Sequence, residues 1–129
     1  KTNKDKKYPN SPSGMPGVQT LLPVMLDHVS NNRLKLEQLM KLICENPVKI
    51  FGIKNKGFLK ENYDADITIV DLNKSININN DDIQSKCGWS PFHGHSFKGS
   101  PVATIINGKI KMLNGKILGE PEGLPLDFD

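Results

Sequence analysis

The sequence predicts an α/β fold with helices in the first part of the chain and short strands in the last part. Apolar residues recur at helical spacing between residues 20 and 51, and alternate at strand spacing from residue 66 onward. Two Asn-Gly pairs, at 107–108 and 114–115, are typical of tight hairpin turns. The change of period near Gly57 favours two structural regions, with strands gathered in the second, over one continuous α/β core.

Composition limits the class of protein. The 129 residues suffice for one domain, and 36% hydrophobic content is low for a globular chain. No apolar run approaches the roughly 20 residues of a membrane helix, so no membrane partner is expected. Residues 1–7 are basic but contain no Arg and no interleaved aromatic residues, which argues against nucleic-acid binding. Two cysteines cannot form a disulfide framework, so a reducing, cytoplasmic location is expected.

The stretch NSPSGMPGVQT, residues 10–20, is the candidate ligand loop. Its prolines restrict the backbone, and its glycines permit positive φ and close approach to a ligand. The N–H groups of Ser13, Gly14 and Gly17 remain available as donors just before a helical pattern, where an anionic ligand would be favoured. An ordinary loop before a helix is the alternative reading of the same composition.

Three helices are expected after this loop. Thr20 can cap the first, whose apolar residues run from Leu21 to Val29 and which ends at Asn31-Asn32. His28 is interpreted as a boundary residue of this helix and not as a ligand. The second helix spans 36–44, and Asn46 is expected to cap a short third helix, 48–51, that Gly52 ends. The predicted inward side of the second helix comprises Leu36, Leu39, Met40, Ile43 and Cys44.

Short strands and loops fill the remainder. Residues 66–71 and 76–78 are predicted as two separate strands, followed by a helical turn over 81–85 that Asn79 or Asn80 caps. A Gly- and Pro-rich loop is expected at 87–99. Strands at 102–106 and 109–113 form a hairpin, and the Pro-rich acidic tail, 119–129, is expected to extend over a surface.

Several side chains could carry chemistry, but their spacing is weak evidence. Cys87, His93 and His95 are three metal-ligating residues within nine positions, whereas structural zinc needs four ligands and no fourth is suitably spaced. The acid pairs 64/66 and 81/82 suit a strand entry and a helical turn better than a catalytic pair. No catalytic triad spacing, phosphate loop or dinucleotide motif is present.

Five segments, taken in order, resemble one enzyme class. They are PSGMPGVQTLLPVML, ENPVKIFGI, KGFLKENYDADITIVDL, SKCGWSPFHG and KGSPVATIINGKI, and the resemblance extends from Tyr8 to Leu118. The second segment and the DADITIVD of the third resemble the amidohydrolase superfamily in general. The sequences PSGMPGVQT and SKCGWSPF are similar to dihydroorotases in particular, of the class that also resembles allantoinases and hydantoinases.

The resemblance implies the C-terminal part of a metal-dependent hydrolase (β/α)8 TIM barrel, plus the C-terminal strands of a small composite β-sandwich. Residues 1–56 would supply the last barrel loop and the closing helices of the barrel. Residues 57–129 would supply the sandwich strands and the tail. The loop at Asn10–Gly17 would then lie at the catalytic C-terminal face of the barrel.

The activity implied is reversible hydrolysis of dihydroorotate to N-carbamoyl-aspartate in pyrimidine biosynthesis, with zinc as the cofactor. The family's zinc-ligand and catalytic Asp motifs are not found in this sequence, and His93-Gly-His95 lies too late in the chain to be the family's His-x-His. The metal ligands are therefore expected in an upstream portion, and this chain alone is expected to be inactive. Pro12, Ser13 and Gly14 match the segment whose backbone groups hold the substrate ring.

The resemblance also implies partners and leaves alternatives. Besides the small-molecule substrate, the expected partners are the upstream portion of the same enzyme and either a second copy or aspartate transcarbamoylase. One alternative is an allantoinase- or hydantoinase-type cyclic amidohydrolase, which substrate assays would distinguish. The other is a non-catalytic dihydroorotase-like partner of aspartate transcarbamoylase, in which the upstream metal ligands would be missing.

Overall fold

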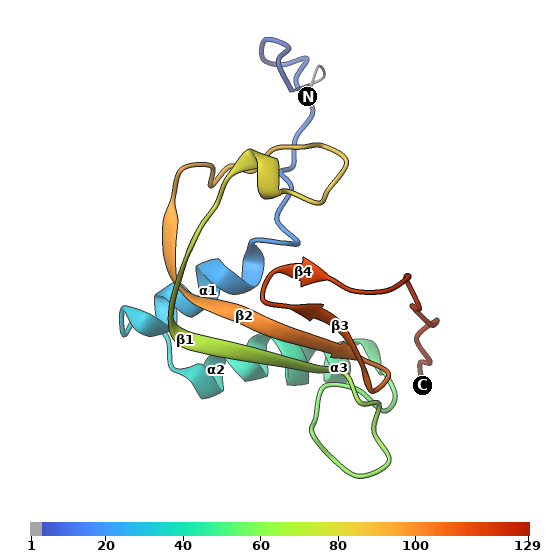
Figure 1. The fold of residues 1–129 in the computed structure, drawn as a ribbon. Helices are drawn as coiled ribbons and strands as arrows, with labels where there is room; N and C mark the ends of the chain where they lie inside the picture. The colour runs from blue at the N-terminus through green and yellow to red at the C-terminus, as the bar shows by residue number, and fades with distance from the viewer. Residues whose placement is uncertain (1–3) are drawn as a thin grey trace.

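The computed structural model describes residues 4–129, in which helices precede a four-stranded antiparallel sheet. The sheet order is β1-β2-β3-β4, and Figure 1 shows β2 between β1 and β3. The sequence predicts this order, with the helices first and the strands last. The elements are α1 (Leu21–Ser30), α2 (Leu36–Met40), the π-helical turn η1 (Lys41–Glu45), α3 (Asn46–Phe51), β1 (Ile67–Asn77), the 3-10 turn η2 (Asn80–Asp82), β2 (Ser96–Ile106), β3 (Lys109–Leu113) and β4 (Lys116–Ile117).

Helix α1 lies where the sequence predicts it, but Thr20 does not cap it with its side chain. Thr20 occupies the N-cap position with αR backbone angles, whereas a capping residue needs an extended backbone to turn its oxygen toward the first-turn N–H groups. Its hydroxyl instead donates to Gly17 O at 3.3 Å, and the residue is only 2% exposed. At the other end the Asn31 N–H donates to Asp27 O, and Asn32 leaves the helix with a φ of 57°.

The predicted break before the third helix is wrong, because the chain stays helical from Leu36 to Phe51. Asn46 has helical angles (φ −66°, ψ −44°) and caps nothing. Pro47 has no N–H to donate to the preceding turn, which would weaken an ordinary α-helix at this point. A π-helical turn accommodates it, with the Asn46 N–H donating to Lys41 O. The helix then ends at Gly52 in a left-handed conformation, as predicted.

The apolar side of this helical run is only partly buried, contrary to prediction. Leu39 is 1% exposed and Leu36 is half-buried. Within residues 4–129 no element covers the rest of this side, so a predicted core face is an exposed apolar face. Its exposed residues include the predicted inward residues Met40, Ile43 and Cys44, together with Leu42, Ile50 and Phe51.

The two predicted strands at 66–71 and 76–78 are a single strand, β1. It pairs with β2 in two ladders, one from Ile67↔Ile105 to Asp71↔Ser100 and one from Ser75↔Lys98 to Asn77↔Ser96. Between the ladders Asp71 Oδ1 accepts hydrogen bonds from the N–H groups of Asn73 (2.8 Å) and Lys74 (3.2 Å). This side-chain turn forms a bulge that interrupts the alternation of residues without ending the strand.

Strand β2 begins at Ser96 and not at Val102, so the end of the predicted 87–99 loop is part of the sheet. Gly99 and Pro101 disfavour a strand in isolation, and pairing with β1 overrides that preference. The helical turn predicted at 81–85 is shorter and earlier, and is η2.

The hairpin predictions are confirmed. Asn107 and Gly108 have φ angles of 50° and 75°, the positive values that a two-residue hairpin turn requires, and β3 returns over Lys109–Leu113. Asn114 and Gly115 repeat this turn with φ angles of 50° and 82° before the short β4.

The core lies where α1 packs on β2. A side-chain Cβ built at Gly99 would lie 2.5 Å from Leu26 Cβ, so the helix approaches the backbone of β2 directly. Few apolar side chains reach full burial in residues 4–129, which reflects the exposed face of the α2–α3 run. The buried apolar residues are Leu26, Leu39, Ile78 and Ala103.

The acidic tail extends over the surface and returns to the end of α3, in agreement with the prediction. Ile53 and Phe128 form an isolated antiparallel bridge. On either side of it the Lys54 N–H donates to Asp127 O and the Asp129 N–H to Gly52 O, each at 2.9 Å. Figure 1 shows this red segment along one side of the molecule, running from β4 toward α3. Among the described helices, none has the length and apolar character needed to cross a membrane.

Candidate functional site

The predicted ligand loop, residues 10–20, is largely exposed before its buried end at Thr20 and has free backbone donors. Pro12, Ser13 and Gly14 are all exposed, and Gly14 has a φ of +86°. The Lys4 ammonium donates to the carbonyl oxygens of Pro12 and Gly14. The N–H groups of Ser13 and Gly14 donate no hydrogen bond to any group within residues 4–129. The loop therefore offers donors, and these suit a ligand rich in acceptor oxygens.

The end of this loop is fixed to α1. Gly17 O accepts hydrogen bonds from the N–H groups of Thr20 (3.1 Å) and Leu21 (2.8 Å). Thr20 is buried, so this turn is anchored in the interior while the preceding residues remain outside. The helix start consequently determines where the exposed part of the loop can lie.

A second segment lies beside the ligand loop at the same end of the molecule (Figure 1, the yellow region). We call residues 78–95 the Trp89 loop. Its two ends are joined by hydrogen bonds from the Ile78 N–H to His95 O (2.9 Å) and from the Gly94 N–H to Ile78 O (2.8 Å). Inside it, Asn80 Oδ1 accepts from the N–H of Ser90 at 2.9 Å. The hydrogen bonds between Ile78, Gly94 and His95 thus join the start of the Trp89 loop, after β1, to its end, before β2.

The histidines of the Trp89 loop have structural partners. His93 Nδ1 accepts a hydrogen bond from the Asn80 N–H at 3.2 Å, so one of its ring nitrogens is already engaged. The His95 ring is stacked on Phe97, with ring centroids 6.2 Å apart. Cys87 Sγ contacts Trp89 O at 3.6 Å. The three residues that the sequence offered as candidate metal ligands are thus not gathered into one site.

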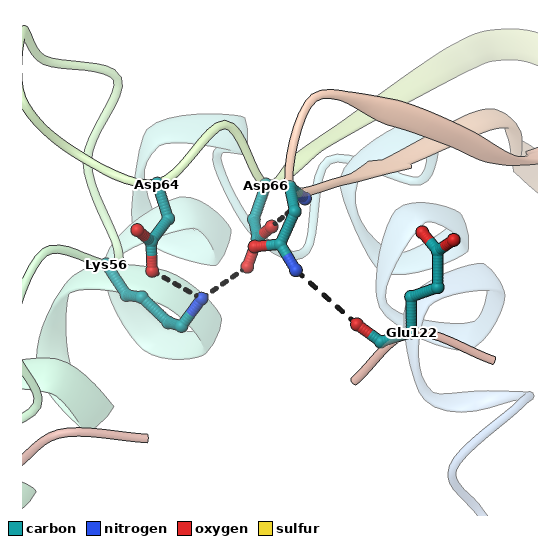
Figure 2. A network of polar contacts seen from close by, with 5 residues as sticks. Lys56, Asp64, Asp66 and Glu122 are labelled. Carbon is teal, nitrogen blue, oxygen red and sulfur yellow. Dashed lines mark hydrogen bonds and ion pairs between the residues drawn. The ribbon is translucent and has the colours of Figure 1, made fainter. Parts of the chain in front are cut away.

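Asp64 and Asp66 are held by Lys56, as Figure 2 shows. The Lys56 ammonium lies 2.8 Å from Asp64 Oδ2 and 2.5 Å from Asp66 Oδ2. Asp66 Oδ1 also accepts from the Asn107 N–H at 2.8 Å. The hydrogen bonds to Asp64 and Asp66 raise the pKa of Lys56, and those from Lys56 and Asn107 lower the pKa of Asp66. This cluster joins the entry of β1 to the β2–β3 turn and is a structural clasp.

The tail adds a second ion pair beside the clasp. Glu122 Oε2 lies 2.9 Å from the Lys111 ammonium and 3.0 Å from that of Lys109, and both lower the pKa of Glu122. Asn107 Nδ2 donates to Glu122 O at 3.5 Å, a long contact drawn in Figure 2. An open groove of about 370 Å³ lies between the clasp and residues 123–127.

The described residues do not fit a zinc ion. No three His, Cys, Asp or Glu side chains in residues 4–129 are arranged to hold a metal. The carboxylates of Asp64 and Asp66 both contact the Lys56 ammonium, which would repel a cation. The second acid pair, Asp81 and Asp82, lies on the exposed turn η2.

Sequence reasoning missed two residues that organise this region. Lys56 carries no motif, and its carboxylate partners lie beyond a turn in the chain. Gln19 contacts residues more than sixty positions later: its side chain bonds Asp82 O and the Gln84 N–H. The Lys56 pairing depends on the conformation of the turn between residues 56 and 64, and the Gln19 pairing depends on how two distant segments meet.

Known proteins match this chain in sequence. Residues 14–111 match the profile described as "Amidohydrolase family". The dihydroorotase of Pyrococcus furiosus is 41% identical over 111 residues, which are 86% of this chain and 27% of that protein. The dihydroorotase of Methanothermobacter thermautotrophicus is 36% identical over 121 residues, 93% of this chain and 28% of that protein. The chain thus spans about a quarter of the length of these relatives.

Solved structures match the fold. The L-hydantoinase (dihydropyrimidinase) from Arthrobacter aurescens superposes with a TM-score of 0.82 at 36% identity, over 86% of this chain and 25% of that one. A D-hydantoinase superposes with a TM-score of 0.83 at 28% identity, over 92% of this chain and 26% of that one. Both similarities extend through the helices and the sheet.

Proposed function

Because the chain belongs to the amidohydrolase family, we propose that it is part of a dihydroorotase, which hydrolyses dihydroorotate reversibly to N-carbamoyl-aspartate. Identities of 41% and 36% to dihydroorotases support dihydroorotate as the substrate. The observation that carries the proposal is the exposed loop at 10–17, in which the Ser13 and Gly14 N–H groups have no partner within the described residues.

The arrangement of this loop suits the proposed substrate. The Ser13 N–H shares a peptide unit with the Pro12 carbonyl, and in a trans peptide the two groups point in opposite directions. Since the Pro12 carbonyl accepts from Lys4, the Ser13 N–H points away from that side chain. Dihydroorotate carries a carboxylate and two ring carbonyls, all of which accept hydrogen bonds. Pro12, Ser13 and Gly14 are proposed to hold the substrate through backbone groups.

The proposal extends to the fold. Residues 1–56 would form the last loop and closing helices of a TIM barrel, and residues 57–129 the C-terminal strands of a β-sandwich. The superpositions on hydantoinases support a hydrolase fold of this kind for the chain as a whole. The exposed apolar face of the α2–α3 run is consistent with a neighbouring part of the barrel packing there.

Zinc, when bound, would polarise the scissile carbonyl and activate water. The described residues do not supply its ligands, so these are proposed to lie in the portion of the enzyme upstream of this sequence. The role left to this chain is to bind and orient the ring. The chain alone is therefore expected to be inactive.

A substrate comparison on the full-length protein tests the proposal. Purified protein is assayed with dihydroorotate, hydantoin and allantoin under identical conditions, and the highest kcat/KM is expected for dihydroorotate. A preference for hydantoin would favour the hydantoinase alternative, which the structural similarity to hydantoinases supports. Absence of turnover with all three substrates would favour a non-catalytic partner of aspartate transcarbamoylase.

A further inference from the structure

The Gln19 side chain joins the ligand loop to the Trp89 loop. Gln19 Nε2 donates to Asp82 O at 2.9 Å, and Gln19 Oε1 accepts from the Gln84 N–H at 2.9 Å. Both ends of the amide are used, one as donor and one as acceptor, against backbone groups of one short segment. This matched pair fixes the segment more closely than a single hydrogen bond would.

Each side of this contact is itself anchored. Gln19 directly precedes the buried Thr20. It lies two residues after Gly17, whose carbonyl accepts the first hydrogen bonds of α1. On the other side, the two ends of the Trp89 loop are joined by hydrogen bonds, and Ser90 is only 6% exposed. A small cavity of about 10 Å³ lies between the two, lined on one side by Pro16 to Thr20 and on the other by Ile83, Ser85, Trp89 and Ser90.

We propose that Gln19 is a positioning residue that holds the ligand loop against the Trp89 loop. On the basis of the proposed function, in which the backbone of residues 12–14 binds substrate, the SKCGWSPF segment then supports that backbone. Without the two Gln19 hydrogen bonds, the hydrogen bonds that remain to the ligand loop within residues 4–129 come from Lys4, Lys7 and the start of α1. A loosened loop must be ordered when substrate binds, which weakens binding more than it slows the reaction of bound substrate.

The test compares three variants of the full-length protein. Gln19→Met keeps the length of the side chain but makes neither hydrogen bond. Gln19→Glu keeps the acceptor for the Gln84 N–H and loses the donor to Asp82 O. Gln84→Ala is the matched control: alanine retains the backbone N–H that donates to Gln19 Oε1 and removes only the long contact of Gln84 Nε2 with Asp82 O, at 3.5 Å.

Two measurements are made on each variant. In hydrogen exchange, Gln19→Met should speed exchange of the Gln84, Thr20 and Leu21 amides. In steady-state kinetics with dihydroorotate it should raise KM about fivefold while kcat stays within about twofold, as expected for two solvent-exposed hydrogen bonds. Gln19→Glu should lie between Gln19→Met and wild type, and Gln84→Ala should match wild type.

The outcomes separate this inference from the proposed function. Unchanged amide exchange together with unchanged KM in Gln19→Met would overturn the positioning role. A fall in kcat accompanied by loss of bound metal would also overturn it, because the side chain would then be supporting the fold. A wild-type protein that does not turn over dihydroorotate would instead overturn the proposed function, and amide exchange would still decide whether Gln19 holds the loop.

Discussion

The loop before α1 and the junction of α1 with β2 each contain a glycine with positive φ, for opposite reasons. Gly14 has a φ of +86° and nothing within 4 Å of the position a Cβ would take. Gly99 has a φ of +102°, and its Cβ would lie 2.5 Å from Leu26 Cβ. The space around Gly14 is open to a ligand, whereas the space at Gly99 is filled by the fold. A positive φ therefore accompanies close packing at Gly99, whereas at Gly14 it accompanies open space in the proposed substrate loop.

The largest effect is expected at the packed junction. Gly99→Ala places a methyl group against Leu26 and strains the backbone, so it should lower the free energy of unfolding of the full-length protein by about 3 kcal/mol or more. Denaturant unfolding measures this. The matched control is Gly115→Ala, which has a similar φ of +82° and no atom within 4 Å. Equal losses in the two variants would show that strain alone matters and would remove the distinction drawn above.

At the open loop the expected effect is on activity. Gly14→Ala strains the positive φ and adds a methyl group beside the proposed substrate donors, so kcat/KM for dihydroorotate should fall roughly tenfold. Metal content should remain that of wild type, because no metal ligand is expected in the loop. Steady-state kinetics and metal analysis are the measurements, again with Gly115→Ala as the control. Wild-type kinetics would exclude this loop from the site, and lost metal would make it a folding element.

Breaking the clasp should lower stability, as at Gly99 but by a smaller amount, without changing activity. Asp66→Asn weakens the contact with Lys56, and because the carboxylate is partly exposed the expected loss of unfolding free energy is about 1 kcal/mol, with KM unchanged. The pKa of Asp66 is lowered in the folded protein, so its contribution is present above its ordinary value of 3.8 and is lost as the pH falls through the folded value. Lys56, whose pKa is raised, contributes below its ordinary value of 10.5 and loses this as the pH rises through the folded value.

Unfolding measured between pH 3 and pH 8 checks this linkage. The difference between wild type and Asp66→Asn should be constant near neutral pH and shrink below about pH 4. A difference that is the same at all pH values would mean that the carboxylate charge makes no contribution. A change in KM would show that Asp66 affects substrate binding, and it would contradict the distinction between a packed region and a substrate-binding region.

The smallest effect is expected at Ser13. If Ser13 acts through its backbone N–H, Ser13→Ala leaves that donor in place, and kcat/KM should stay within about twofold of wild type. The side chain is exposed, so stability should not change either. A loss as large as that of Gly14→Ala would instead assign substrate contact to the Ser13 hydroxyl.

Some features determined by neighbouring residues could be predicted from the sequence, but local contacts that modify a helix or strand pattern could not. The turn at Asn107-Gly108 was predictable because its two residues carry the required conformation themselves. The continuity of helix from α2 to α3 was missed because Pro47 ordinarily starts a helix, and here a π-helical turn accommodates it. The unity of β1 was missed because Asp71 bonds its own following backbone and so interrupts the alternation.

The candidate site divides in the same way. The exposed loop at 12–14 follows from its prolines and glycines, and from its place before a helix. The contact of Gln19 with the Trp89 loop joins residues 63 and 65 positions apart, and an exposed Gln has no pattern that distinguishes it. The burial predicted for Met40, Ile43 and Cys44 failed because an amphipathic pattern specifies a face and not the element that covers it.

The bulge in β1 has a consequence for the pairing of the sheet. Residues 72–74 lie between the pairs Asp71↔Ser100 and Ser75↔Lys98, opposite Gly99 alone, so the cross-strand pairing is interrupted there. The β1–β2 pairing is thus divided into two ladders, and the first of them has a further irregularity between Ile69 and Val70. The β1 residues that lead to the Trp89 loop are therefore paired with β2 separately from those near the Lys56 clasp.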